Sequence, residues 1–250
     1  MSSTQLMSRA RTLSPARPAR TTSGAAGAVV GVLALQGGVA EHARMVEGLD
    51  ARAVLVRRAE QLAGPDGPRV DALILPGGES SAIDRLLRLL DLFEPLRATI
   101  RAGVPALGTC AGLILLARAI HDPAPGQRSL GLLDVAVARN AFGPQLVSTE
   151  ASFEVSGTAG DGPGGRVRGA LIRAPEVREV GPSARVIARS DGRILGVTSV
   201  SSADEAAGTA ATDDPGRAPT GIGSVTGVAF HPELSGDPAL HRALITRATR

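Results

Sequence analysis

Short apolar runs alternate with amphipathic stretches from Val29 to Ile120, and this alternation restricts the fold more than any other feature of the chain. The run VVGVLALQGG at 29–38 is continuously apolar, ends in glycines and precedes a stretch with helical spacing of its apolar residues. The pattern predicts strands at 29–38, 52–58, 71–79 and 104–110, and helices at 39–49, 81–103 and 111–120, with a bend permitted at Pro95. Strands that alternate with helices form a mostly parallel sheet covered on both faces. We therefore predict the α/β class.

The second half of the chain changes to short strand-like segments separated by turns. These segments lie at 130–143, 151–155, 168–175, 184–190, 193–200 and 224–234. They predict an antiparallel extension of the parallel sheet.

Two segments have the composition of disordered chain. Residues 1–27 are rich in Ser, Thr, Arg, Pro and Ala, and residues 201–223 form a polar, low-complexity insert. We predict one domain over residues 28–250, preceded by a disordered extension and containing that insert, with a smaller Gly-rich loop at 157–165. An Arg- and Ser-rich, acid-free start is also typical of an organellar transit peptide. A dispensable extension or a start codon assigned too early is the simpler explanation.

Composition excludes several classes of protein. With 43% hydrophobic residues the chain can bury a full core, but no apolar run reaches the ~18 residues of a membrane-spanning helix, so we expect no membrane partner. A single cysteine excludes an internal disulfide and a cysteine-built zinc site, and it agrees with a reducing, cytoplasmic location. The net charge of +3 comes from the N-terminal tail, since residues 41–250 hold 23 Arg and 24 acidic residues. Without Trp or Tyr to stack bases, we expect no nucleic-acid partner.

The lone cysteine lies between a predicted strand and a predicted helix, in the order Gly108-Thr109-Cys110-Ala111-Gly112. The pattern G-x-C-x-G is the thiol counterpart of the nucleophile elbow, in which small flanking residues permit a sharp turn that exposes the nucleophile. A helix that begins at the thiol also directs its positive dipole end at the sulfur, which favours the thiolate. The alternative is a buried structural cysteine, which composition alone favours because unpaired cysteine is usually buried.

A thiolate nucleophile needs a proton carrier, and FHPEL at 230–234 offers one. His231 precedes Pro232 and is biased to extended backbone, in which residues two apart point to the same side, so His231 and Glu233 can meet. A carboxylate beside the imidazole fixes its tautomer and stabilises its protonated form. Alone the motif also fits a surface turn, but together with the cysteine elbow it favours a triad of Cys110, His231 and Glu233.

The other three histidines are predicted to have no part in this chemistry. His42 and His241 lie on helix-like stretches, where we expect them half-buried or solvated, and His121 follows a predicted helix end. No spacing among the four histidines is typical of metal ligands, so we expect no metal.

Residues 75–82, LPGGESSA, follow a predicted strand with two glycines. Glycines let the backbone approach a ligand closely, and the N–H groups around them could hold an oxyanion. The same residues fit a plain strand-to-helix turn with Ser80 or Ser81 as helix N-cap. Both interpretations can hold at once.

Six motifs follow one another within residues 29–248: LALQGGVAEH, LILPGGESSA, GTCAGLILLA, ARNAFG, LIRAP and FHPEL. In this order they closely resemble the glutaminase subunits of pyridoxal 5'-phosphate synthase, which are class I glutamine amidotransferases. The resemblance implies their three-layer fold and the hydrolysis of L-glutamine to L-glutamate and ammonia. Cys110 would attack the side-chain amide, His231 would shuttle protons under the influence of Glu233, and a γ-glutamyl thioester would form and be hydrolysed.

The resemblance also implies a substrate site and a partner. The implied glutamine-binding residues are Gly78, Glu79, Ser80, Arg139, Ile172 and Arg173. Ammonia would pass to a separate barrel-shaped synthase subunit in a hetero-oligomer, which combines it with a pentose phosphate and a triose phosphate. Pyridoxal 5'-phosphate is thus a product of the complex, and we expect no cofactor in this chain. Glutaminase activity is expected to be low until the synthase docks.

Two positions depart from the resemblance. Family members usually carry Arg where this chain has Pro144, and an aromatic residue where it has Thr149. These changes affect the expected synthase contact or local packing rather than the triad.

Two alternative functions stay open at this point. One is the glutaminase subunit of another class I amidotransferase, such as imidazole glycerol phosphate synthase. The other is a non-catalytic partner that keeps the fold only to bind a synthase, against which the intact Cys110, His231 and Glu233 argue.

Overall fold

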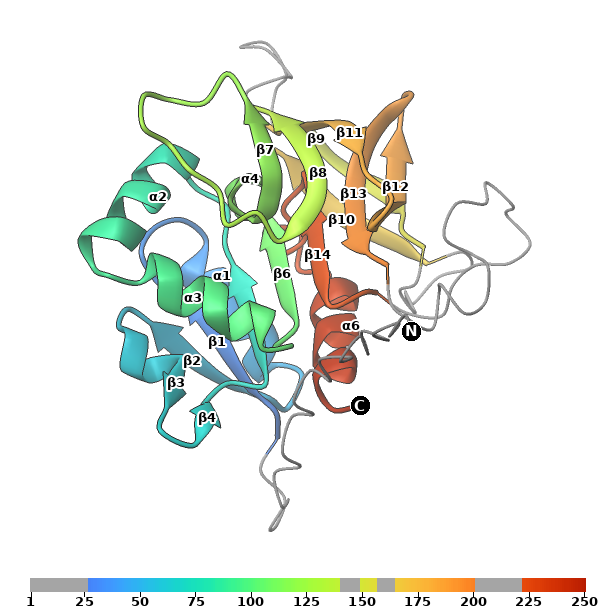
Figure 1. Cartoon of the computed structure of the whole chain (residues 1–250). Coiled ribbons are helices and arrows are strands. Elements are labelled where there is room, and N and C mark those ends of the chain that lie inside the picture. The colour runs from blue at the N-terminus through green and yellow to red at the C-terminus, as the bar shows by residue number, and fades with distance from the viewer. Residues whose placement is uncertain (1–26, 140–148, 157–164, 201–221) are drawn as a thin grey trace, which may run out of the picture.

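The structure is a computed structural model that describes residues 27–139, 149–156, 165–200 and 222–250. Its centre is a ten-stranded sheet in the order β2-β1-β5-β6-β14-β13-β11-β8-β7, with β12 paired to β13 (Figure 1). The strands of this sheet are β1 (Val29–Leu33), β2 (Arg52–Val56), β5 (Ala72–Leu75), β6 (Ala106–Thr109), β7 (Ala117–His121), β8 (Leu133–Ala138), β11 (Glu176–Val180), β12 (Ala184–Ser190), β13 (Arg193–Ser199) and β14 (Val225–Val228). Two small antiparallel pairs accompany it, β3 (Ala63–Gly64) with β4 (Gly67–Pro68), and β9 (Thr149–Glu154) with β10 (Arg166–Leu171).

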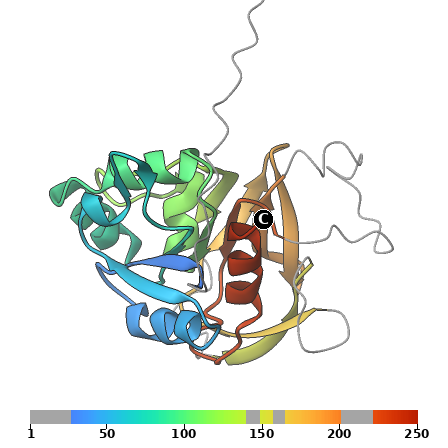
Figure 2. The same cartoon turned by 90° about the horizontal axis from the view of Figure 1, so that it is seen from below.

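Helices cover both faces of the parallel half of the sheet. The helices are α1 (Val39–Glu47), α2 (Ser80–Leu89), α3 (Phe93–Arg101), α4 (Ala111–Leu116) and α6 (Ala239–Ala248), with a 3-10 turn at Ala59–Gln61. Helices α1 and α6 lie on one face, and α2, α3 and α4 lie on the other, as the view from below shows (Figure 2). The predicted three-layer α/β fold is thereby confirmed.

The parallel strands end at one edge of the sheet, and this edge carries the motifs. Neighbours in the series β2-β1-β5-β6-β14 pair in parallel, and β5, β6 and β14 are buried along their whole length, as strands covered on both faces must be. In register, Leu75 pairs with Gly108 and Thr109 with Val228. The segments that follow β5, β6 and β14 therefore emerge side by side. Beyond β14, the antiparallel pairings of β13, β11 and β8 form the predicted extension.

The long helix predicted at 81–103 is two helices. Helix α2 ends at Leu89, where the N–H of Leu92 donates to the Leu87 carbonyl at 2.7 Å and Asp91 takes a positive φ of 53°. Pro95 does not bend a helix, because it lies in the first turn of α3, where no intrahelical N–H is needed. Because leucines lie on both sides of the break, the apolar pattern of the sequence does not show the boundary between α2 and α3.

The helix predicted at 111–120 was also too long, since α4 ends at Leu116 and the chain continues directly as β7. Strand β7 pairs in parallel with β8, so the same apolar residues that fit a helix form an outer strand. His121 is therefore the last residue of a strand, and β11 was not predicted at all.

Several predictions fall on residues that the structure does not describe. The proposed disordered segments 1–27 and 201–223 lie outside it except for Gly27, Ile222 and Gly223, and the loop predicted at 157–165 except for Gly165. Of the described ones, the N–H of Gly223 donates to Thr198 Oγ1 in β13 at 2.8 Å. Pro144 is not described, and Thr149 begins β9. Within the described parts of the chain, no helix is long and apolar enough to span a membrane.

Helix α2 offers a matched pair of leucines for testing the core. Leu87 is fully buried, whereas Leu89 is 73% exposed. We expect Leu87→Ala to lower the free energy of unfolding by about 2–5 kcal/mol, because it removes buried methyl groups and leaves a cavity. Leu89→Ala should change it by less than about 0.5 kcal/mol. Urea unfolding of both variants measures the difference, and equal losses would contradict the packing of α2.

Candidate active site

A cavity of about 310 Å³ opens at the edge of the sheet where the parallel strands end. All nine residues proposed from the sequence for catalysis or glutamine binding lie on its wall: Gly78, Glu79, Ser80, Cys110, Arg139, Ile172, Arg173, His231 and Glu233. The wall also contains Gly37, Gly38, Gly77, Ile114 and Leu234. Residues spread over nearly 200 positions of the chain thus converge on one hollow of the size that holds small molecules.

Cys110 occupies a sharp strand-to-helix turn. It follows β6, precedes α4, and takes φ of 48° and ψ of −102°, a strained conformation for a residue with a side chain. A Cβ at Gly112 would collide with the Leu75 carbonyl, and one at Gly108 with the backbone of Gly112. Both glycines of the G-x-C-x-G pattern are therefore required by close backbone contact. The Cys110 sulfur lies 3.9 Å from the Ile172 carbonyl oxygen.

His231 and Glu233 meet as predicted, although the extended segment ends at His231 and does not continue to Glu233. Strand β14 ends at Val228, His231 forms an isolated bridge with Ala170, and Glu233 lies in the turn that follows. His231 Nδ1 donates to Glu233 Oε1 at 2.7 Å, and the backbone of His231 exchanges two hydrogen bonds with Ala170 of β10. A Cβ at Gly77 would collide with the imidazole ring, so the glycine permits the close approach of the histidine.

The electrostatics of this pair favour charge on both partners. Burial opposes the protonated form of His231, but its hydrogen bonds to Cys110 and Glu233 prevail and raise its pKa to about 10. Burial likewise opposes the ionised form of Glu233, but hydrogen bonds from His231 and His42 lower its pKa to about 2. Near neutral pH the carboxylate is charged and the imidazole is protonated beside the cysteine sulfur.

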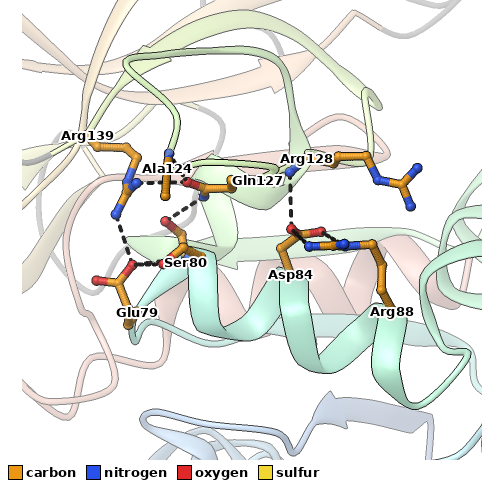
Figure 3. A network of polar contacts seen from close by, with 9 residues as sticks. Glu79, Ser80, Asp84, Arg88, Ala124, Gln127, Arg128 and Arg139 are labelled. Atoms are coloured by element: carbon orange, nitrogen blue, oxygen red, sulfur yellow. Dashed lines mark hydrogen bonds and ion pairs between the residues drawn. The ribbon is translucent and has the colours of Figure 1, made fainter.

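A polar network connects the Gly-Gly-Glu-Ser turn to Arg139 (Figure 3). Arg139 donates to Glu79 Oε1 at 3.0 Å and to Gln127 Oε1 at 2.8 Å, and Gln127 Nε2 donates to Ser80 Oγ at 3.0 Å. Glu79, not Ser80 or Ser81, is the N-cap of α2, and its carboxylate accepts from the Ser81 N–H at 3.1 Å. Its pKa is lowered, since the hydrogen bonds from Ser81 and the charge of Arg139 outweigh burial.

The segment that carries Gln127 is attached to α2 and α3. Buried Asp84 accepts from the backbone N–H of Arg128 at 3.2 Å while it pairs with Arg88 at 2.9 Å (Figure 3). The Arg128 guanidinium lies 4.8 Å from the centre of the Phe93 ring, and Arg97 donates to the Leu130 carbonyl at 2.9 Å. Gln127 is thus presented to Arg139 by a segment held at several points.

Sequence reasoning missed the residues that support this wall. Gln127 lies in a segment without a motif, and Gln36, within the quoted LALQGG, received no role although its Oε1 accepts from the Glu79 N–H at 2.9 Å. The expectation that His42 and His241 are half-buried or solvated is wrong, because both side chains are fully buried. The two imidazole rings pack against each other, with their centres 5.1 Å apart. The sequence around neither histidine indicates this contact.

Among the described residues, no group of three or more His, Cys, Asp and Glu side chains is arranged to hold a metal ion. The cavity instead combines a strained cysteine, a buried His–Glu pair and an Arg–Glu pair. This arrangement, on a mostly parallel sheet, is the one expected of an α/β enzyme that uses a cysteine nucleophile.

Comparison with known proteins narrows this class. A family model described as the SNO glutamine amidotransferase family matches residues 32–203. The chain is 46% identical over 217 residues to pyridoxal 5'-phosphate synthase subunit PdxT of Acidothermus cellulolyticus, covering 85% of this chain and 89% of that protein. It is 42% identical to the PdxT subunit of Streptomyces avermitilis, covering 89% and 96%. The chain belongs to the SNO glutamine amidotransferase family.

Solved structures agree with this assignment. A crystal structure described as a glutamine amidotransferase matches with a TM-score of 0.69 and 36% identity, covering 88% of this chain and 99% of that one. A putative GMP synthase subunit from Thermoplasma acidophilum, at 16% identity and a TM-score of 0.57, shares the fold.

The lowered pKa of Glu233 predicts a contribution to acid stability. Its pKa is about 2 in the folded chain against a usual 4.5, so its stabilising effect is complete above pH 4.5 and is lost as the pH falls towards 2. Between these values the free energy of unfolding should fall more steeply for the wild type than for Glu233→Gln. Denaturant unfolding at a series of pH values measures both slopes. Glu47→Gln, at an exposed position of α1, is the control and should retain the wild-type slope.

Proposed function

We propose that Cys110, His231 and Glu233 form the catalytic triad with which this glutamine amidotransferase hydrolyses L-glutamine to L-glutamate and ammonia. The observation that carries the proposal is their convergence in one cavity, in which the cysteine occupies a strained elbow and the His–Glu pair lies against it. The chain is a glutaminase subunit, as its family and its PdxT relatives indicate.

The proposed reaction has two halves. The Cys110 thiolate attacks the side-chain amide carbon of glutamine, a C–S bond forms, and His231 gives its proton to the departing ammonia. The resulting γ-glutamyl thioester is then attacked by water, whose proton passes to His231, and the C–S bond breaks to release glutamate. Glu233 holds the Nδ1–H of His231 throughout and stabilises its protonated form. Gly77 and Gly78 line the cavity, and their backbone N–H groups, with those at the start of α4, are proposed as donors to the oxyanion.

The remaining cavity residues are proposed to hold the amino acid end of glutamine. These are Gly78, Glu79, Ser80, Arg139, Ile172 and Arg173. Arginine guanidinium groups complement a carboxylate and the Glu79 carboxylate complements an ammonium group, so the wall offers both charges that free glutamine carries.

Ammonia would be consumed by a partner. The relatives are named as subunits of pyridoxal 5'-phosphate synthase, and this supports a hetero-oligomer with the barrel-shaped synthase subunit, which receives the ammonia. A single, unpaired cysteine supports a reducing, cytoplasmic setting for the complex. The same relatives disfavour imidazole glycerol phosphate synthase as the assembly, and the convergence of the three triad side chains disfavours a non-catalytic partner.

The proposal predicts cysteine-dependent glutamate release. Full-length chain mixed with a pyridoxal 5'-phosphate synthase subunit should release glutamate from glutamine, and Cys110→Ala should reduce this release to background because the nucleophile is gone. His121→Ala, an exposed histidine on β7, should leave the rate unchanged. The wild type alone should be slower than with the synthase. If Cys110→Ala releases glutamate at the wild-type rate, the triad is wrong.

The network around Arg139 predicts a separate effect on substrate binding. Gln127→Leu removes the acceptor for Arg139 and the donor to Ser80, so we expect the KM for glutamine to rise about tenfold with little change in kcat. Gln127→Glu keeps an acceptor for Arg139 and should recover part of that loss. Steady-state glutaminase kinetics separate the two constants. A change in kcat alone would contradict a binding role for this network.

A further inference from the structure

Behind the triad carboxylate lies a pair of histidines that the proposed reaction does not use. His42 on α1 and His241 on α6 are both fully buried, and His42 Nδ1 lies 2.8 Å from His241 Nε2. The other ring nitrogen of His42, Nε2, lies 3.5 Å from Glu233 Oε1, the oxygen that also accepts from His231. A series of polar contacts therefore extends from Glu233 through His42 to His241, in the core of the molecule.

The hydrogen positions in this pair follow from the partners that each nitrogen has. Within the described residues, His241 Nδ1 is buried and has no hydrogen-bond partner. A hydrogen placed there would be an orphaned buried donor, which folded proteins strongly avoid. His241 therefore carries its hydrogen on Nε2 and donates it to His42 Nδ1. Burial also lowers the pKa of His241 to about 3, which keeps this ring neutral.

The tautomer of His42 is then determined. Since its Nδ1 accepts from His241, neutral His42 carries its hydrogen on Nε2, which faces Glu233 Oε1 and Thr109 Oγ1, the latter at 3.1 Å. The opposite tautomer would direct a lone pair at a buried carboxylate. Thr109 immediately precedes Cys110, so His42 contacts both the elbow and the carboxylate of the triad.

We propose that His42, held in this tautomer by His241, is a positioning residue that fixes the Glu233 carboxylate towards His231. This inference rests on the proposed triad. The His42 ring, whose Nε2 lies 3.5 Å from Oε1, restrains the rotation of a side chain whose Oε2 has no hydrogen-bond partner among the described residues. The consequence is a carboxylate that stays aligned while His231 takes up and returns a proton. His42 acts on the chemical step and not on glutamine binding, because it is absent from the cavity wall.

Two amide substitutions separate this role from packing. In Gln the amide nitrogen has the same bond separation from Cβ as imidazole Nε2, so His42→Gln can still donate to Glu233. In Asn the amide has the separation of Nδ1, so His42→Asn reaches His241 but not Glu233. Both variants replace a buried ring with a smaller polar group, and each is the control for the other.

Glutaminase kinetics of the full-length variants with the synthase subunit, alongside their thermal unfolding, test the proposal. We expect His42→Asn to lower kcat about tenfold or more and to leave KM within about twofold, as for the loss of one polar contact to a buried charged group. His42→Gln should recover most of that kcat, although both variants melt at similar temperatures. Wild-type kcat in His42→Asn, or equal losses of kcat in the two variants, would overturn the proposal.

A second pair of variants covers the case in which α1 does not tolerate substitution. His241→Gln keeps an N–H at the position of Nε2 and should retain kcat, whereas His241→Leu removes the group that determines the tautomer and should lower it. Equal kcat in these two variants would also overturn the proposal. Cys110→Ala separates a failure of the proposed triad from a failure of the proposed role of His42. If it is inactive while His42→Asn keeps the wild-type kcat, the positioning role fails and the triad stands, whereas an active Cys110→Ala removes the triad itself.

Discussion

The contact between the elbow at Cys110 and strand β5 is the constraint on which the active-site geometry depends. Gly112 packs so closely on the Leu75 carbonyl that no Cβ fits between them, and the N–H of Cys110 donates to Val228 of β14 at 2.8 Å. A strained residue of this kind costs of the order of 1–3 kcal/mol and persists only where its surroundings leave no alternative. Here the two strands on either side of β6 supply that rigidity. The same strands lead into the Gly-Gly-Glu-Ser turn and into His231, so one packing arrangement brings Cys110, His231 and that turn together.

Short motifs were predictable because their chemistry is local. The glycines around Cys110 are dictated by contacts within a few residues, and the spacing of His231 and Glu233 allowed their contact whether the chain is extended or turned. Element boundaries were less predictable. Leucines continue through the break after α2, where Leu89 and Leu90 are exposed and Leu92 is buried, so the apolar pattern does not mark the end of the helix. Ala117–His121 forms a strand because it pairs with β8. That partner lies further along the chain, so the local sequence does not indicate the strand.

Residues that support the site through distant partners were beyond the sequence. Gln127 acquires its role because Asp84 and Phe93 hold its segment against α2 and α3, and no local pattern records those contacts. His42 and His241 lie 199 positions apart. Each histidine, taken alone, fits the polar side of a helix. The two are buried together only because α1 and α6 lie on the same face of the sheet. The resemblance to a family could supply site residues by motif, but not the side chains that orient them.

The two sides of Glu233 explain how a buried carboxylate can stay charged in this fold. A buried ion without hydrogen-bond donors would take up a proton instead, because desolvation disfavours its charged form. At Oε1, His231 supplies one N–H from the cavity side and His42 faces the same oxygen from α1. His42, fixed in orientation by an uncharged His241, faces this anion from α1, whereas the imidazole proposed to exchange protons with the substrate is the one beside Cys110.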